Sequence, residues 1–346
     1  MARTAIGIDF GHAHIALVEL RRGRQLQIRR ASLLPVPQNA VREGQIADRT
    51  VLAEMLNEVV PTVRVNRAAV VAGISGPKLT MRTLRITETD PDEFRIAVRQ
   101  EFAAVMHMSP EVLEQYVIDY HVLPSDESDS YKVLAVGILR DTVTEYSRLL
   151  RRVRLPLHVL DVEAFALPRA TPVDGPACHI EIGAEYTQIL VTLHGEYSVY
   201  RIIPAGMNRL TSAIATAYDI SHAEAMVLQG SKHIDNIIAE APGDRSSLRY
   251  ALQEIAGGLM QTLEFFRAKQ QASSVSELLN SAFLCGGGAL QKGMTQLLQE
   301  ELGLRVEIMH PFSHMAGSTD LPTATLDMEP LFAGAVGLAK RGIEEL

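Results

Sequence analysis

The chain has 346 residues, of which 47% are hydrophobic and 21% are charged, and its formal net charge at pH 7 is −8. This length exceeds one compact core, so we expect two lobes or a domain with an insertion. The negative charge argues against general affinity for nucleic acid, which requires a basic face. No apolar run reaches the about 18–20 residues that are needed to span a bilayer, and the first residues lack the apolar stretch of a secretory signal peptide. We therefore expect a cytoplasmic protein that reaches a membrane only through partners.

The first residues predict a lobe with the element order βββαβ. Alternating apolar residues indicate three antiparallel strands, and apolar residues at helical spacing follow a capping residue, Asp48 or Thr50. The predicted elements cover residues 4–10, 14–20, 25–33, 48–63 and 67–76. We interpret the RRGR turn at 21–24 as a solvated hairpin tip, with contact to an anionic surface as the alternative.

A block of different texture then predicts an inserted α+β module. It contains a strand at 81–86, a helix at 89–106, strands at 116–123 and 131–139 around a polar loop at 124–130, and a helix at 141–155. Residues 158–170 predict a strand and a helix that return to the first lobe.

The second half repeats the pattern of the first. Strands are predicted at 177–183, 188–195 and 197–206, helices at 207–218 and across 221–272, a glycine-broken strand at 281–290, and then a helix at 291–303, a strand at 305–311 and a helix at 330–346. The segments IGIDFG (6–11) and HIEIGA (179–184) open the two copies, and duplicated lobes create a cleft between them. Cys178 and Cys285 lie far apart in apolar runs, so we expect buried free thiols.

This reading divides the chain into four parts. They are lobe 1 (1–80 and 156–175), the inserted module (81–155), lobe 2 (176–210 and 275–346, with the last helix able to return to lobe 1) and a helical subdomain (211–274).

The first turn of each lobe predicts a phosphate hairpin. Its backbone N–H groups surround a concavity, its glycine lets a phosphate approach, and the preceding acid can hold hydrated Mg²⁺. Either hairpin alone is weak evidence, whereas a matching pair across a cleft is much stronger. FLCGGGALQKGM (283–294) adds a strand, a glycine turn and a helix, which together favour nucleotide binding.

Four segments resemble the actin/Hsp70-like ATPase superfamily: DFG (9–11), EIGA (181–184), FLCGGGAL (283–290) and EPLFAGAVGLAKR (329–341). The inserted module resembles the extra subdomain of FtsA-type bacterial actins. DVEAFALPRA (161–170) and the segment 180–214 are most similar to the PilM family of type IV pilus assembly proteins, and the similarity covers about residues 4–342.

This resemblance implies an α/β, actin/Hsp70-like two-lobe ATPase fold, with duplicated ribonuclease-H-like lobes and an FtsA-type inserted α+β subdomain. It implies ATP with Mg between the lobes and weak or absent hydrolysis. It also implies docking of the N-terminal tail of a PilN-type inner-membrane protein in a groove between lobe 1 and the inserted module. PilO, PilP, pilus motor components and self-association are further implied contacts.

The resemblance also implies the nucleotide site, residue by residue. The first phosphate loop holds Asp9, Gly11, His12, Ala13 and His14, and the second holds Glu181, Gly183, Ala184 and Thr187. Glu224 comes from the helical subdomain, and Gly286, Gly287 and Gly288 form the adenosine motif. Asp9 and Glu181 would contact the Mg²⁺ ion that is bound with the nucleotide.

The chain departs from the family at several of these positions. His12 and His14 replace small hydroxyl residues, Glu181 replaces Asp, and Ala16 and Val227 stand where the family often has lysine. Each lost cation removes a charge-assisted contact worth roughly 1.5–3 kcal/mol where buried, so we expect weakened nucleotide binding.

Other functions fit the sequence less well. A small-molecule kinase requires a general base in the cleft, and Asp161 and Glu163 lie where the family has only a strand and a helix start. An FtsA-like division protein would end in an interfacial helix, but residues 330–340 are too uniformly apolar for one. His12 and His14 point to one side of a strand, yet two ligands without a third do not make a metal site.

Overall fold

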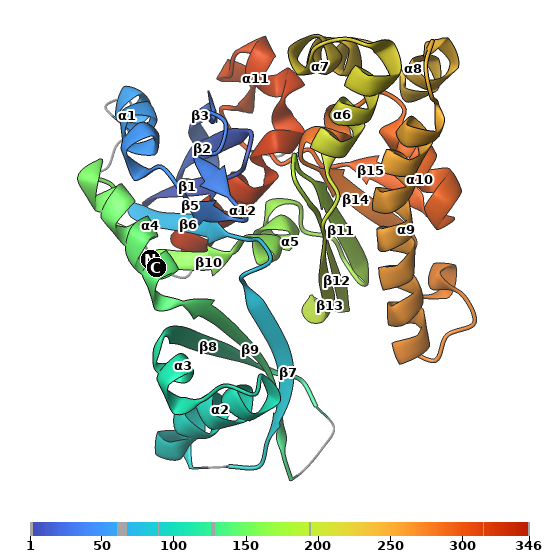
Figure 1. The fold of residues 1–346 in the computed structure, drawn as a ribbon. Helices are drawn as coiled ribbons and strands as arrows, with labels where there is room; N and C mark the ends of the chain where they lie inside the picture. Colours follow the sequence, from blue (N-terminus) through green and yellow to red (C-terminus); the bar gives the residue numbers. More distant parts are fainter. Residues whose placement is uncertain are drawn as a thin grey trace.

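A computed structural model describes residues 3–60, 68–88, 90–125, 129–193, 195–313 and 315–344. Two five-stranded sheets form the cores of two lobes, and a smaller module with a three-stranded sheet extends from the first lobe (Figure 1). The predicted two-lobe α/β architecture is confirmed.

The sheet of lobe 1 has the strand order β10-β6-β1-β2-β3. Its strands are β1 (Thr4–Phe10), β2 (His14–Arg21), β3 (Gln27–Pro35), β6 (Ala69–Ile74) and β10 (Val159–Val162). Strands β1, β2 and β3 are antiparallel, whereas β1, β6 and β10 are parallel. β1 is buried at six consecutive positions because helices cover both faces of the sheet.

Between β3 and the first helix the structure contains a small hairpin that the sequence did not predict. It consists of β4 (Val41–Arg42) and β5 (Gln45–Ile46), and strands of two residues are too short to show a period. Helix α1 (Arg49–Val59) follows, and the side chain of Asp48 accepts hydrogen bonds from two amides of its first turn. Residues 61–67, where the predicted helix ended and the next strand began, lie outside the described residues.

The inserted module contains β7 (Thr80–Ile86), α2 (Pro91–Val105), a short unpredicted α3 (Pro110–Glu114), β8 (Tyr116–Leu123), β9 (Tyr131–Leu139) and α4 (Arg140–Arg152). Its sheet has the order β7-β9-β8 and is antiparallel. α2 packs on this sheet through Phe94, Val98 and Phe102, and Gly137 leaves room for the Phe102 ring. The last helix, α4, instead packs on lobe 1 through Tyr146, Leu149 and Leu150.

The sheet of lobe 2 repeats the topology of lobe 1. Its order is β13-β12-β11-β14-β15, from β11 (Ala177–Ile182), β12 (Thr187–Leu193), β13 (Glu196–Ile203), β14 (Ser281–Cys285) and β15 (Arg305–Ile308). In both sheets the first three strands form an antiparallel meander and the last two run parallel to the first. The duplication predicted from IGIDFG and HIEIGA is therefore present in the topology.

The helices of lobe 2 differ in detail from the prediction. α6 (Met207–Tyr218) begins and ends as expected, but the predicted helical stretch at 221–272 consists of α7 (His222–Ser231), α8 (Ile234–Glu240) and α9 (Ser246–Lys269). β14 ends at Cys285 rather than at 290, because the glycines form a tight 3-10 turn before α10 (Met294–Leu302). Neither the first break, at Lys232–His233, nor the second, near Pro242–Gly243, was recognised from the sequence.

The last helix, α12 (Ala333–Glu344), packs against β1 of lobe 1, after the short helix α11 (Thr323–Asp327). The approach is close: a Cβ atom on Gly7 would lie 2.0 Å from the carbonyl oxygen of Ala335. Asp161 forms ion pairs with Arg169, which follows in α5 (Ala166–Ala170), and with Arg341 of α12. α12 is thus a core helix of lobe 1.

The prediction for the two cysteines is confirmed. Cys178 and Cys285 are both buried free thiols, as predicted. Among the helices of the described residues, none combines the length and the apolar character of a membrane span.

Candidate functional site

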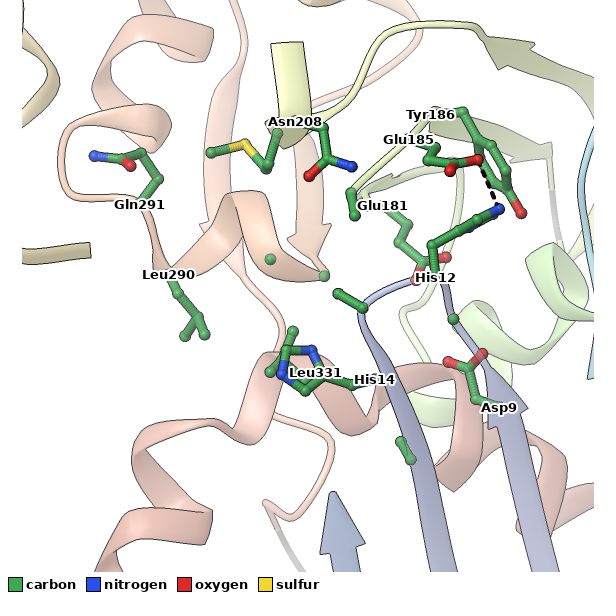
Figure 2. Close-up of a pocket in the computed structure, with 18 of the residues that line it drawn as sticks. Asp9, His12, His14, Glu181, Glu185, Tyr186, Asn208, Leu290, Gln291 and Leu331 are labelled. Atoms are coloured by element: carbon green, nitrogen blue, oxygen red, sulfur yellow. Dashed lines mark ion pairs between the residues drawn. The ribbon is translucent and has the colours of Figure 1, made fainter. Parts of the chain in front are cut away.

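A cavity of about 400 Å³ lies between the two lobes, where the β1–β2 turn and the β11–β12 turn meet (Figure 2). Its volume falls in the range of small-molecule sites. Ten of the predicted site residues line it: Asp9, Gly11, His12, Ala13, His14, Glu181, Gly183, Ala184, Gly286 and Gly287.

Three predicted site residues do not line this cavity. The Thr187 hydroxyl is buried and donates a hydrogen bond to the carbonyl oxygen of Ala205 at 2.8 Å. A Cβ atom on Gly288 would lie 2.4 Å from the Cβ of Ile182, so this glycine permits close packing. Glu224 is exposed at the start of α7 and forms a capping box with Ser221.

A cluster of three carboxylates lines the cavity. Asp9 at the end of β1, Glu181 at the end of β11 and Glu163 after β10 each offer an oxygen, and these oxygens lie within 4.8 Å of one another. Asp9 is 7% exposed, and its Oδ1 has no hydrogen-bond partner among the described residues. A buried carboxylate oxygen without a partner is costly, so this donor set fits a divalent cation with oxygen ligands.

Burial and mutual repulsion raise the pKa values of two of these acids. The pKa of Asp9 is raised well above its ordinary value, first by burial and then by the charge of Glu163. The pKa of Glu181 is raised first by burial, then by Glu163 and Asp9. The cluster therefore retains protons that a bound cation would displace.

One neutral side chain holds part of the cluster in place. The Gln188 amide donates hydrogen bonds to Glu163 Oε1, at 3.3 Å, and to Glu181 Oε2, while its carbonyl accepts one from the Tyr200 hydroxyl at 3.1 Å. Gln188 is buried at the second position of β12 and orients two carboxylates from different lobes.

His12 pairs with the opposite hairpin. Its Nε2 lies 2.9 Å from Oε2 of Glu185, and its ring contacts the Tyr186 ring edge-on at 5.0 Å between centroids. The Gly44 N–H points at the same Nε2 from 3.5 Å, a longer contact, so we assign the Nε2 proton to the bond with Glu185. The contact of His12 with Gly44 is then packing rather than a hydrogen bond. Burial lowers the pKa of His12, and the Glu185 charge opposes that effect in part.

A second contact between the hairpins' lobes lies beside this pair. The Ser75 hydroxyl, just after β6, is 2.9 Å from the Tyr186 hydroxyl. Two residues of the β11–β12 turn thus contact lobe 1 directly, Glu185 through the ring of His12 and Tyr186 through the hydroxyl of Ser75. This edge of the cavity is closed by protein contacts.

The rest of the lining is mainly apolar, and Leu290 lies on the side of the cavity away from Asp9 and Glu185 (Figure 2). This part of the lining consists of Leu33, Met226, Leu290, Met328 and Leu331, with Asn208, Gln229 and Gln291 as neutral polar side chains. Apolar walls with a few amides suit the base and ribose of a nucleoside. His14 lines the cavity as well, and burial lowers its pKa.

The described residues that line the cavity include no lysine or arginine. Asp9, Glu163, Glu181 and Glu185 bring four carboxylates to it. A phosphate ligand in this cavity therefore needs a cation to offset its charge.

Sequence reasoning missed several of these residues. Glu163 was read only as a helix start, and Ser75, Gln188 and Tyr186 belong to no local motif. The one available signal was the period of the strand that contains Gln188: it alternates with Thr187, so only one of the two can face the cleft.

The sequence model of the family described as type IV pilus assembly protein PilM matches residues 7–343. The chain belongs to the PilM family. A solved structure titled PilM–PilN type IV pilus biogenesis complex is similar to it with a TM-score of 0.83 and 25% identity, and the alignment covers 98% of each chain.

Two further solved structures share the fold at lower identity. The ethanolamine utilization protein EutJ from Carboxydothermus hydrogenoformans has a TM-score of 0.58 and 15% identity, over 97% of this chain and 89% of that one. MreB5 of Spiroplasma citri, in a structure with bound ADP, has a TM-score of 0.56 and 12% identity, over 99% of each chain. The PilM-family chain thus has the two-lobe fold of actin-like ATPases, as predicted.

The structure also shows where the two residues lie that stand in place of the family's lysines. Ala16 lines the cavity, where a lysine side chain would extend into it. Val227 is 73% exposed on α7, and the cavity is instead lined by Met226, Gln229 and Gly230 of that helix.

Proposed function

We propose that this chain is a nucleotide-dependent scaffold of the type IV pilus inner-membrane machinery. It binds ATP with Mg²⁺ between its lobes and docks the N-terminal tail of a PilN-type membrane protein between lobe 1 and the inserted module. The observation that carries the proposal is its similarity, over 98% of its length, to a structure solved as a PilM–PilN complex.

The cavity supports the nucleotide part of the proposal. Two glycine-containing turns face each other across it, Asp9 and Glu185 lie on one side, and the apolar side chain of Leu290 lies on the other (Figure 2). This is the order in which a nucleotide presents metal-bound phosphates, ribose and base. MreB5, which shares the fold, has been solved with ADP.

Asp9, Glu163 and Glu181 are the residues that would hold the divalent cation. The ion would supply the positive charge that the phosphates need in a cavity lined by four carboxylates. Glu163 could also orient a water molecule, but the described lining residues include no cationic side chain to stabilise charge that develops on a leaving phosphate. We therefore propose binding with slow or absent hydrolysis.

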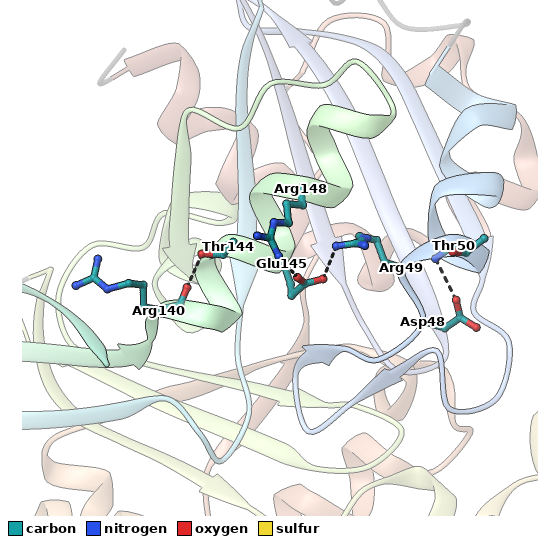
Figure 3. Close-up of polar contacts among 7 residues, drawn as sticks. All are labelled: Asp48, Arg49, Thr50, Arg140, Thr144, Glu145 and Arg148. Atoms are coloured by element: carbon teal, nitrogen blue, oxygen red, sulfur yellow. Dashed lines mark hydrogen bonds and ion pairs between the residues drawn. The ribbon is translucent and has the colours of Figure 1, made fainter. Parts of the chain in front are cut away.

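The junction between lobe 1 and the inserted module supports the docking part. Arg49 at the start of α1 forms an ion pair with Glu145 of α4 at 2.9 Å, and Arg148 contacts the other oxygen of the same carboxylate at 3.1 Å (Figure 3). Asp48 caps α1, and the Thr144 hydroxyl donates to the Arg140 carbonyl within α4. The Arg49–Glu145 pair joins α4 to lobe 1, beside the packing of Tyr146, Leu149 and Leu150, so a peptide at this junction would meet a defined surface.

A short path of contacts connects the cavity to the junction. His12 in the cavity wall touches the amide of Gly44, and the carbonyl of Gly44 accepts a hydrogen bond from the Tyr146 hydroxyl of α4 at 3.0 Å. Gly44 has a φ of +70°, and a Cβ atom there would lie 1.8 Å from the carbonyl oxygen of Ser75. Because Gly44 is packed this closely, we propose that a shift of the phosphate hairpin at His12 moves Gly44 and, through the Tyr146 hydrogen bond, α4.

The remaining contacts of the scaffold follow from its family. We propose a cytoplasmic location, peripheral to the inner membrane through PilN, with PilO, PilP and pilus motor components as further contacts and self-association as an additional property.

The docking proposal is tested by capture of the full chain on an immobilised N-terminal peptide of a PilN-type protein, with a scrambled peptide as control. We expect capture on the native peptide alone. Equal capture on both peptides, or on neither, would overturn the docking proposal and leave the nucleotide proposal to be judged by calorimetry.

A further inference from the structure

An arginine cluster lies at the end of lobe 1 that is opposite the cavity. Arg3 precedes β1, Arg21 ends β2, and Arg22 and Arg24 belong to the β2–β3 turn; all four are exposed. The register brings them together, because Arg21 pairs with Thr4 and the Arg22 amide donates to the Arg3 carbonyl at 2.9 Å.

The end of α4 adds three more exposed arginines, Arg151, Arg152 and Arg154. Residues 153–158 connect this helix to β10, which runs parallel to β6 and β1. The amino ends of these parallel strands lie at one end of the sheet, so α4 finishes at the same end as Arg3 and the β2–β3 turn. We call these seven residues the arginine end.

The arginine end is broad and is opposite in sign to the chain as a whole. Neighbouring strands lie about 4.8 Å apart, so the five-stranded sheet is about 20 Å wide there. Among the described residues, the acidic side chains at the same end include Glu58 of α1 and Glu344 of α12. Against a net charge of −8, seven clustered arginines are a strong asymmetry.

We propose that the arginine end binds the anionic phospholipid surface of the membrane. Guanidinium groups pair with phosphates in two-pronged hydrogen bonds, and clustered basic residues bind anionic lipid surfaces cooperatively. This contact is independent of nucleotide and of PilN, and it orients lobe 1 with its cavity directed away from the bilayer.

The shape of the arginine end favours a lipid surface over an acidic peptide. It is built from the β2–β3 turn, the start of β1 and the end of α4, which lie across one end of a five-stranded sheet. Strand ends, unlike strand edges, offer no row of free N–H and C=O groups to an extended peptide. Cationic side chains distributed over a wide face suit a layer of headgroups.

The test is co-sedimentation of the full chain with vesicles of phosphatidylcholine alone and of phosphatidylcholine mixed with phosphatidylglycerol. Two charge-reversed variants alter the arginine end, R21E/R24E and R151E/R152E. The matched control is R95E/R305E, which makes the same change in net charge. Arg95 and Arg305 lie outside the arginine end, and each side chain is 72% exposed. Circular dichroism confirms that each variant is folded.

We expect binding to the mixed vesicles alone, lost at about 0.5 M salt, where exposed charges are screened within a few ångströms. Each variant of the arginine end should bind at least about tenfold more weakly, and the control within about twofold of the unmodified chain. Equal losses in all three variants, or equal binding to both vesicle types, would overturn the proposal. Binding to polyglutamate or duplex DNA that exceeds binding to the mixed vesicles would overturn it as well.

Discussion

The Tyr146 hydroxyl of α4 donates a hydrogen bond to the carbonyl oxygen of Gly44, 3.0 Å away, while the amide of Gly44 lies 3.5 Å from Nε2 of His12. One residue of the β4–β5 turn therefore touches both the inserted module and the wall of the cavity. We therefore propose that this turn couples nucleotide binding to partner binding.

Tyr146→Phe removes this hydrogen bond and preserves the ring, which packs edge-on against Phe10 at 5.2 Å. We expect a loss of about 1 kcal/mol in the free energy of unfolding, typical of one hydrogen bond. We also expect an unchanged affinity for Mg-ATP and a smaller effect of Mg-ATP on tail-peptide affinity, both measured by calorimetry. Tyr250→Phe, at a side chain that is 62% exposed, is the control. Full coupling in Tyr146→Phe would exclude the β4–β5 turn as the path.

Gly287→Leu tests the position of the nucleotide. A Cβ atom at this glycine meets nothing closer than the Ile182 carbonyl oxygen at 3.9 Å, so the fold can accept a side chain that enters the cavity. We expect Mg-ATP affinity to fall at least about tenfold with little change in melting temperature. Gly257→Leu on α9 is the matched control, since a Cβ there also meets nothing within 4 Å. Unaltered ATP binding by Gly287→Leu would place the nucleotide elsewhere.

Removal of the divalent cation is expected to abolish ATP binding. The described lining residues include four carboxylates and no lysine or arginine, so without a metal the phosphates of ATP would lie against carboxylates with no cationic side chain to offset their charge. Titration of ATP in the presence of a chelator, compared with Mg²⁺, measures this effect. Asp9→Asn should weaken Mg-ATP binding, whereas Glu54→Gln, at an exposed position of α1, should leave it unchanged. Comparable affinity with and without metal would contradict the role assigned to the carboxylates.

The carboxylate cluster predicts opposite pH effects on binding and on stability. The pKa values of Asp9 and Glu181 are raised in the folded chain, so the folded state holds protons that the unfolded state has released. Without ligand, this contribution to stability grows as pH falls through the raised pKa values, down to the ordinary values of 3.8 and 4.5. Affinity for Mg-ATP should fall over the same interval, because the cation must displace those protons. Calorimetry and thermal melts across this interval measure both, and an affinity that increases with acid would contradict the assignment.

His179 on β11 predicts acid sensitivity of the opposite sign. Its two ring nitrogens are buried without a hydrogen bond of normal geometry among the described residues, and its ring stacks on Phe283. Burial lowers its pKa to about 4, and the Thr171 backbone opposes that effect in part. Because the unfolded value is 6.5, the folded state takes up its proton later, and stability is lost as pH falls from about 6.5 toward about 4. Urea denaturation gives the drop in unfolding free energy between pH 7 and about 4.5. This drop should be about 2–3 kcal/mol smaller in His179→Leu than in the unmodified chain. Equal losses in both would mean that His179 is protonated without cost.

Local patterns in the sequence predicted much of this fold and the glycine-rich part of its site. The two hairpins and the 286–288 turn carry glycines and acids next to strands, and the element order repeats in each half. Short elements such as β4, β5 and α11 have too few residues to show a period.

The remaining site residues depend on contacts that the sequence does not encode locally. Glu163 joins Asp9 and Glu181 only because β10, β1 and β11 end at the same cavity. Matching a family motif placed Thr187 and Glu224 in the site, but strand alternation turns Gln188 to the cavity and α7 turns Gln229 to it instead. His12 was assigned to the first phosphate loop, and its ring pairs with Glu185 of the opposite hairpin.

The most direct test of the central claim is calorimetric titration of the full chain with a PilN-type N-terminal peptide, with and without saturating Mg-ATP. A nucleotide-dependent scaffold should bind the peptide in at least one condition, with an affinity that differs about fivefold or more between the two, the usual lower range of coupling between sites. Equal affinities in the two conditions, measured while Mg-ATP is shown to be bound, would contradict a nucleotide-dependent scaffold.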